Sequence, residues 1–147
     1  ENVRLEFLGD IEALPQKTRE VFEEGLSETA GHTGMTRELA VNYGARAELD
    51  PAARLISQEV AAGTLAADEI DQDCVARHLY TADLPDPEPL IRTSGQLRLS
   101  NYRLRHLAYS EFDNTDTLWP DLDRWELLRA IRSFQTRDRR FGGVSAK

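Results

Sequence analysis

The side chains best suited to binding an anion are concentrated in residues 92–101, which read Arg-Thr-Ser-Gly-Gln-Leu-Arg-Leu-Ser-Asn. Arg92 and Arg98 supply guanidinium groups, which form paired hydrogen bonds to phosphate oxygens. Gly95 allows the backbone to approach a ligand closely, and Ser100 adds a hydroxyl beside the N–H groups of an expected helix start. A diphosphate would use all of these donors. The alternative is a polar loop whose arginines pair with surface carboxylates, and the spacing alone does not decide between the two.

Three further segments could serve the same ligand. Glu111 could hold Mg²⁺ against a phosphate, although an ordinary salt bridge is the alternative. Residues 42–48, Asn-Tyr-Gly-Ala-Arg-Ala-Glu, follow an expected strand and could line the same cleft, or form a helix-capping turn. The terminal run 137–143, Arg-Asp-Arg-Arg-Phe-Gly-Gly, could reach an anion on another subunit, or remain a solvated basic tail.

Other kinds of site find little support in the residue pattern. His32, His78 and His106 lack the spacing of zinc ligands, and Cys74 falls on an apolar helix face, where a cysteine acts as a small buried hydrophobe. The sequence contains neither a Gly-x-Gly-x-x-Gly motif nor a Walker-type loop. We therefore expect no dinucleotide or nucleoside-triphosphate site.

Composition narrows the possible environment and partners. The 147 residues carry 18 Lys and Arg against 26 Asp and Glu, a net charge of −8, which argues against nucleic-acid binding. A single cysteine fits a reducing compartment, and no apolar stretch is long enough to span a membrane. We expect one cytoplasmic domain over residues 1–147.

The elements that must position these residues alternate along the chain. Strands are expected at 2–9, 38–43, 90–91 and 112–118, and helices at 15–30, 51–62, 71–79, 101–107 and 123–134. Asp50 is the expected N-cap of the second helix, and residues 84–89, with three prolines, form a rigid connector. This alternation predicts an α/β fold, a mostly parallel sheet with helices on both faces and ligands at the carboxyl ends of the strands. Because the chain begins with Glu1 already inside a strand, we expect that preceding residues were removed or are encoded elsewhere.

Taken together, these motifs resemble the C-terminal two-thirds of a cis-prenyltransferase, the family of undecaprenyl diphosphate synthase. The matching segments are residues 3–10, 41–44, 84–87, 91–95, 98–101, 108–111, 118–121 and 139–143. The resemblance implies an incomplete form of that fold, without its N-terminal strands. It also implies condensation of isopentenyl diphosphate onto an allylic prenyl diphosphate with Mg²⁺.

The resemblance assigns roles to individual residues. Arg92, Arg98 and Ser100 match positions that bind isopentenyl diphosphate, and Glu111 matches a Mg²⁺-binding glutamate. Arg140 and Gly142 match an Arg-x-Gly element that reaches a partner's diphosphate across a dimer interface.

The sequence also departs from the family pattern. The Asp-Gly-Asn-Gly-Arg loop with the catalytic aspartate is absent, so we expect no catalytic residue in this chain and no turnover by it alone. Gln96 stands where glutamate is usual, Leu97 where some members have a metal-binding histidine, and Ala45 where a glycine is usual. Further departures are Arg103, Arg105, His106 and, in place of an aromatic pair at the dimer interface, Asp113 and Asn114.

Three hypotheses follow. The chain is part of a cis-prenyltransferase, supplying the isopentenyl diphosphate site while the missing segment or a partner chain supplies the rest. Alternatively, it is a non-catalytic accessory subunit of a heteromeric cis-prenyltransferase. The third is an α/β module that binds no relevant ligand. The first two imply a homo- or hetero-oligomer, with possible peripheral membrane contact through the lipid product.

Overall fold

The computed structural model describes residues 1–138. Backbone contacts group the chain into two compact units, Glu1–Leu84 and Pro85–Lys147. The boundary falls inside the proline-rich connector expected at residues 84–89, and this connector is non-helical, as predicted. The single domain over residues 1–147 stays a prediction, and each unit is described by itself below.

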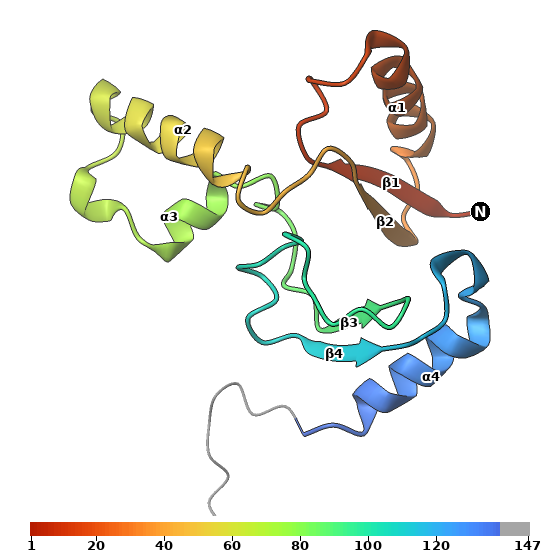
Figure 1. The fold of residues 1–147 in the computed structure, drawn as a ribbon. Coiled ribbons are helices and arrows are strands. Elements are labelled where there is room, and N and C mark those ends of the chain that lie inside the picture. The colour runs from red at the N-terminus through yellow and green to blue at the C-terminus, as the bar shows by residue number, and fades with distance from the viewer. Residues whose placement is uncertain (139–147) are drawn as a thin grey trace, which may run out of the picture. The chain divides into compact units, whose positions relative to one another are not determined.

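The first unit contains a strand–helix–strand crossover. β1 (Val3–Leu8) pairs in parallel with β2 (Met35–Ala40), in a register that runs from Val3 opposite Met35 to Leu8 opposite Ala40. α1 (Gln16–Thr29) connects the two strands and lies along β1 (Figure 1). Phe7 of β1 stacks on Phe22 of α1, with ring centroids 4.2 Å apart, so this helix is fixed to the strand pair through an aromatic contact.

A tight turn closes the carboxyl end of this strand pair. Gly9 follows β1 with φ +130°, and a Cβ at this position would lie 2.2 Å from the carbonyl oxygen of Val41. Only glycine therefore permits this approach. Asn42 Nδ2 donates to the Asp10 carbonyl oxygen at 2.8 Å, and the Asp10 N–H donates to the Asn42 carbonyl at 3.3 Å.

The second strand differs from its prediction. We expected a buried strand at 38–43, whereas β2 spans Met35–Ala40 and most of its residues are exposed. Asn42 takes up the left-handed backbone conformation (φ 49°), which ends the extended run before the turn at Gly44. The apolar residues after Ala40 therefore belong to the turn and not to the strand.

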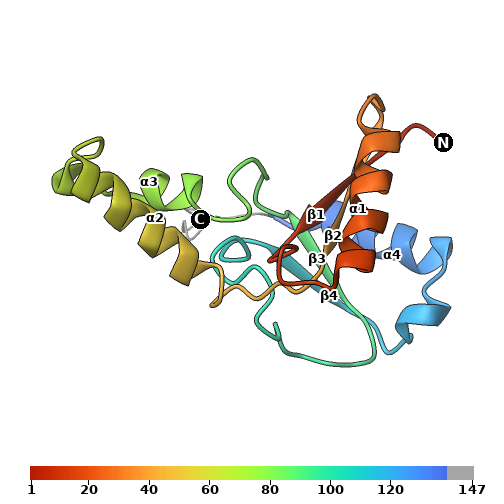
Figure 2. The ribbon, with the colours of Figure 1, turned by 90° about the horizontal axis from the view of Figure 1, so that it is seen from above.

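Two helices complete the first unit. α2 (Leu49–Ala62) ends at Gly63, whose left-handed backbone (φ 73°) lets its N–H reach the carbonyl oxygens of Glu59 and Val60. α3 (Gln72–Arg77) contacts α2 (Figure 2) and begins as predicted, because Asp71 Oδ1 accepts from the Cys74 N–H at 2.7 Å. The prediction of Asp50 as the cap of α2 is wrong. The helix begins at Leu49, and Asp50 lies in its first turn, where its charge complements the helix dipole.

The second unit is built around another parallel pair. β3 (Pro89–Arg92) pairs with β4 (Glu111–Asn114), which places Arg92 opposite Asn114 and Pro89 opposite Glu111. α4 (Arg124–Gln135) packs on both strands (Figure 1). Asp123 caps α4 as predicted, since its Oδ1 accepts from the N–H groups of Trp125 and Glu126.

The helix predicted at residues 101–107 is absent from the structure, and that prediction is wrong. The backbone is left-handed at Ser100 (φ 51°), Asn101 (φ 61°) and Arg103 (φ 41°), so the repeating bonds of an α-helix cannot form. Instead the segment makes successive turns, and the buried Arg103 donates through Nη2 to the Pro85 carbonyl oxygen at 3.0 Å.

The fold class is confirmed as α/β with parallel strands and helices. Among residues 1–138 the strands form two separate two-stranded pairs, with α1 packed on the first and α4 on the second. In the described part of the chain, no helix has the length and apolar character needed to cross a membrane.

Candidate functional site

The loop after β3 is tied to the segment after β4. The N–H groups of Ser94 and Gly95 donate to the carbonyl oxygens of Thr117 and Thr115, both at 2.9 Å. Gly95 has a left-handed backbone (φ 62°), and a Cβ there would lie 2.7 Å from Asp116 Oδ1, so this position favours glycine. These bonds fix the loop at the carboxyl ends of the two strands, where α/β folds bind ligands.

Three of the predicted site residues meet in this loop. Arg92 Nη2 and Arg98 Nε each donate to Ser100 Oγ at 3.3 Å. We call Arg92, Arg98 and Ser100 the arginine cradle. The left-handed backbone at Ser100 turns the chain back toward the end of β3, which brings residues eight positions apart into contact.

The cradle's guanidinium groups have no ion-pair partner in the described chain, although Asp113 lines the pocket beside them. Neither Arg92 nor Arg98 forms an ion pair with a carboxylate of residues 1–138. In addition, the buried Nε of Arg92 has no hydrogen-bond partner in that part of the chain. Two adjacent guanidinium groups without an ion-pair partner are suited to binding a multiply charged anion.

Two pockets adjoin the cradle and share Arg92, Arg98 and Leu99. The first, of about 240 Å³, is lined by Arg92, Gln96, Leu97, Arg98, Leu99, Phe112, Asp113 and Asn114. The second, of about 350 Å³, is lined by Leu90, Ile91, Arg92, Thr93, Arg98, Leu99, Tyr102 and Trp119. Apolar side chains therefore lie beside the two guanidinium groups. This combination suits an anion that carries a hydrocarbon group.

Glu111 does not join the cradle. It lies at the amino end of β4, three register positions from the Arg92–Asn114 pair, or about 10 Å along the strand. Its Oε2 is 3.1 Å from Arg137 Nη1, which also donates to the Phe112 carbonyl oxygen at 2.7 Å. The salt-bridge alternative for Glu111 is thus the one that the structure contains.

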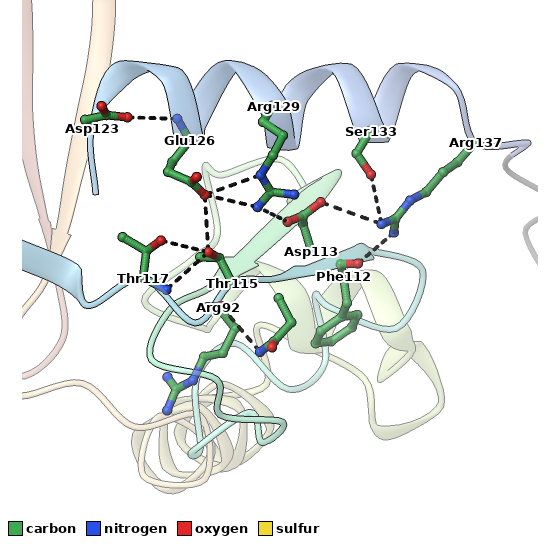
Figure 3. Close-up of polar contacts among 11 residues, drawn as sticks. Arg92, Phe112, Asp113, Thr115, Thr117, Asp123, Glu126, Arg129, Ser133 and Arg137 are labelled. Carbon is green, nitrogen blue, oxygen red and sulfur yellow. Dashed lines mark hydrogen bonds and ion pairs between the residues drawn. The ribbon is translucent and has the colours of Figure 1, made fainter. Parts of the chain in front are cut away.

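A polar network joins β4 to α4 (Figure 3). The buried Asp113 lies 3.3 Å from Arg129 Nη2 through Oδ1 and 3.8 Å from Arg137 Nη2 through Oδ2. Glu126 Oε2 accepts from Arg129 and from Thr115 Oγ1. The hydrogen bond to Glu126 and the nearby charge of Asp113 raise the pKa of Arg129 above its usual value. Sequence reasoning missed this network. The only sign of it in the sequence is the Glu126–Arg129 spacing of three on one helix.

The described residues do not form a metal site by themselves. No group of three or more His, Cys, Asp or Glu side chains is gathered for metal binding within residues 1–138. Glu111 is paired with Arg137, and the cradle presents donors and positive charge, which do not suit a cation. The Mg²⁺ expectation therefore stays a prediction.

The remaining predicted residues lie elsewhere. Segment 42–48 belongs to the first unit, where Tyr43 donates to Glu48 Oε1 at 2.5 Å ahead of α2. Nearby, burial and the charges of Asp10 and Glu48 raise the pKa of Tyr80. Arg140 and Gly142 lie outside the described residues.

The amino-acid sequence matches a known protein family and individual enzymes. Residues 1–142 match the family described as "Putative undecaprenyl diphosphate synthase". The chain is 48% identical over 147 residues to the isoprenyl transferase of Geobacillus kaustophilus, covering 100% of this chain and 57% of that protein. It is 45% identical over 144 residues to the isoprenyl transferase of Bacillus subtilis, covering 98% of this chain and 55% of that protein.

Two solved structures of prenyl diphosphate synthases also superpose on this chain. Lavandulyl diphosphate synthase from Lavandula x intermedia, crystallised with dimethylallyl diphosphate, superposes with a TM-score of 0.90 and 35% identity over 95% of this chain and 60% of its own. A "probable undecaprenyl diphosphate synthase" from Campylobacter jejuni gives 0.81 and 32%, over 96% of this chain and 64% of its own. The chain thus spans less than two thirds of the length of each of these relatives.

Proposed function

Because the chain belongs to the cis-prenyltransferase family, we propose that its arginine cradle binds the diphosphate of isopentenyl diphosphate during cis-polyprenyl diphosphate synthesis. The observation that carries the proposal is the meeting of Arg92 and Arg98 at Ser100, with no carboxylate of residues 1–138 paired to either guanidinium. The retained residues at the matching family positions give the same assignment.

The cradle's contribution to the reaction is binding and orientation. In the condensation, the allylic carbon bonds to the alkene terminus of isopentenyl diphosphate, the allylic diphosphate leaves, and a proton is lost. The isopentenyl diphosphate group itself is retained, so it needs a fixed anchor and not a leaving-group activator. Arg92 and Arg98 neutralise it, while Leu97, Leu99 and Phe112 offer apolar surface for the hydrocarbon.

The proposal includes the parts implied by family resemblance. Mg²⁺ would stabilise the departing allylic diphosphate, and Glu111 is its candidate ligand. Since Glu111 is held by Arg137, the described residues alone give no support to this assignment. The assembly would be a cytoplasmic homo- or hetero-oligomer in which Arg140 and Gly142 approach a partner's diphosphate.

An accessory subunit of a heteromeric enzyme is the second candidate. It is favoured by Asp113 and Asn114, which stand where the family resemblance places an interface aromatic pair. Asp113 is instead buried and paired with Arg129 and Arg137 of the same chain. Native mass spectrometry of the purified assembly distinguishes the candidates. A partner that is itself a complete cis-prenyltransferase supports the accessory role, and a partner that only supplies the catalytic aspartate loop supports a composite enzyme.

The direct test is calorimetric titration of isopentenyl diphosphate into the wild-type chain and into Arg92→Ala and Arg98→Ala variants. Each variant should lose about 1.5–3 kcal/mol of binding free energy, because each lacks one charge-assisted contact. Arg132→Ala is the matched control, since Arg132 is an exposed arginine of α4. Unchanged binding in both cradle variants would refute the proposal.

A further inference from the structure

The turn that follows the arginine cradle is strained and depends on contacts that hold it closed. Ser100, Asn101 and Arg103 have left-handed backbones, with φ of 51°, 61° and 41°. Residues other than glycine adopt this conformation at a cost, so three of them within four positions persist only where tertiary contacts fix the chain. Because Ser100 is the hydroxyl contacted by Arg92 and Arg98, its position in the cradle depends on those contacts.

Two buried side chains lie at the centre of these contacts. Arg103, which is 6% exposed, donates through Nη2 to the Pro85 carbonyl oxygen at 3.0 Å and so ties the turn to the proline-rich connector. The Arg103 carbonyl oxygen accepts from the N–H groups of His106 and Leu107, both at 3.0 Å. His106 is 5% exposed. The turn therefore closes over two side chains that can both carry a positive charge, Arg103 and His106.

The charges around His106 oppose its protonation. Arg103 forms no ion pair with a carboxylate of residues 1–138, so a buried positive charge without such a partner already acts on the ring. The other charged groups that act on it are Arg105 and Asp86, both exposed and therefore screened by solvent. A second buried positive charge needs solvation that the closed turn does not allow. In agreement with this arrangement, burial and then the charge of Arg103 lower the pKa of His106, against the opposing effect of Asp86.

We propose that Arg103 and His106 form a pH-sensitive latch, which keeps Ser100 in the cradle while His106 is neutral and releases the turn when His106 is protonated. The inference rests on the proposed function, because it concerns binding at the arginine cradle. It adds that a bound diphosphate, by favouring the closed turn, favours the neutral ring of a residue outside the anion site. Since Arg103 and His106 both depart from the family pattern, we expect the latch in this chain and not throughout the family.

The first test uses the wild-type chain alone. The ring signal of His106, assigned by triple-resonance NMR, is followed as a function of pH with and without saturating inorganic diphosphate. The latch predicts that diphosphate lowers the pKa of His106, because the anion stabilises the closed turn, which excludes the protonated ring. Simple attraction between a nearby anion and the ring would raise this pKa instead. A raised or an unchanged value overturns the inference.

The second test compares affinities. Inorganic diphosphate is titrated calorimetrically into wild type and His106→Gln at about pH 8 and about pH 5.5, and the two chains are compared at the same pH because the probe itself takes up protons. They should bind equally at the higher pH. At the lower pH wild type should bind about threefold more weakly than the variant, because only its turn is released by protonation. His32→Gln, at a histidine of the first unit, is the matched control and should follow wild type at both pH values.

Failure of the latch and failure of the proposed function give different results. If the ratio of the wild-type and His106→Gln affinities is the same at both pH values, the latch is overturned and the proposed function stands. A variant that is weaker by one constant factor belongs to this outcome, since it indicates only a structural role for His106. If wild type does not bind diphosphate at the higher pH, or Arg92→Ala binds it equally well, the proposed function itself fails.

Discussion

Ser100 accepts a hydrogen bond from Arg92 at 3.3 Å, across eight positions of the chain. The left-handed backbone at Ser100 makes this contact possible, because it directs the residues before it back toward the end of β3. Arg98 reaches the same oxygen, also at 3.3 Å. One hydroxyl therefore contacts both guanidinium groups of the cradle.

Replacing this hydroxyl should weaken the cradle. In Ser100→Ala, the two arginines lose their shared acceptor and the site loses a hydrogen-bonding group, so diphosphate binding should fall by about 0.5–1.5 kcal/mol. Calorimetric titration with inorganic diphosphate measures the change. Ser57→Ala, on an exposed position of α2, is the control. Equal affinities for the two variants would show that the hydroxyl does not contribute.

The parts of the fold that sequence reasoning predicted correctly depend on local chemistry. Asp71 and Asp123 cap α3 and α4 because a carboxylate three residues before a free N–H is a local arrangement, readable without the fold. Gly63 ends α2 through another local feature, its left-handed backbone. Arg92 and Arg98 could be predicted to lie close together because both belong to one short polar segment, and both donate to Ser100 Oγ in the structure.

The missed features depend on contacts between distant residues. The apolar spacing after Asn101 favours a helix, but Arg103 is buried and bound to Pro85, which lies 18 positions earlier. A salt bridge was an expected alternative for Glu111, but its partner, Arg137, lies 26 positions away. No local pattern reports such a pairing, so the partners of Arg103 and Glu111 could not be predicted from the sequence.

The pairing of Glu111 with Arg137 leads to a prediction for metal binding. In the absence of diphosphate, the chain should bind Mg²⁺ only weakly, and Glu111→Gln should leave that affinity unchanged, since the carboxylate is already neutralised by Arg137. Titration of MgCl₂ followed by calorimetry measures both affinities. A clear loss of Mg²⁺ binding in Glu111→Gln would instead show that Glu111 exchanges Arg137 for the metal.

Asp113 should be important for the stability of the second unit. Its side chain is 10% exposed and lies between Arg129 and Arg137, so Asp113→Asn leaves two arginines without their shared carboxylate. The variant should lose about 1–3 kcal/mol of unfolding free energy. Urea unfolding measures this, with Asp121→Asn at an exposed position as the control. A double-mutant cycle with Arg129→Gln should show coupling, and an additive result would indicate that the pair does not contribute.

His78 should make the stability of the first unit depend on pH. Its Nδ1 lies 2.7 Å from the Cys74 carbonyl oxygen and its Nε2 lies 3.0 Å from Glu59 Oε1. Both neighbours are acceptors, so both contacts are hydrogen bonds only when the ring carries two protons. The bond to the Cys74 carbonyl and the bond to Glu59 raise the pKa of His78 above 6.5, against the opposing effects of burial and Arg77.

The sign of this effect follows from linkage. The folded chain binds the His78 proton more tightly than the unfolded chain, so the stabilisation is complete below the unfolded pKa and is lost as pH rises through the folded one. Urea unfolding of wild type and His78→Gln between about pH 5 and pH 9 should therefore show the largest difference at the acidic end. Glu59→Gln should reduce that difference. The contribution of His106 to stability has the opposite pH dependence. Burial and the charge of Arg103 lower the pKa of His106, so its contribution is lost as the pH falls. Wild type and variant must therefore be compared with each other at each pH. A constant difference across the whole range would show that His78 does not titrate in the contact with Glu59.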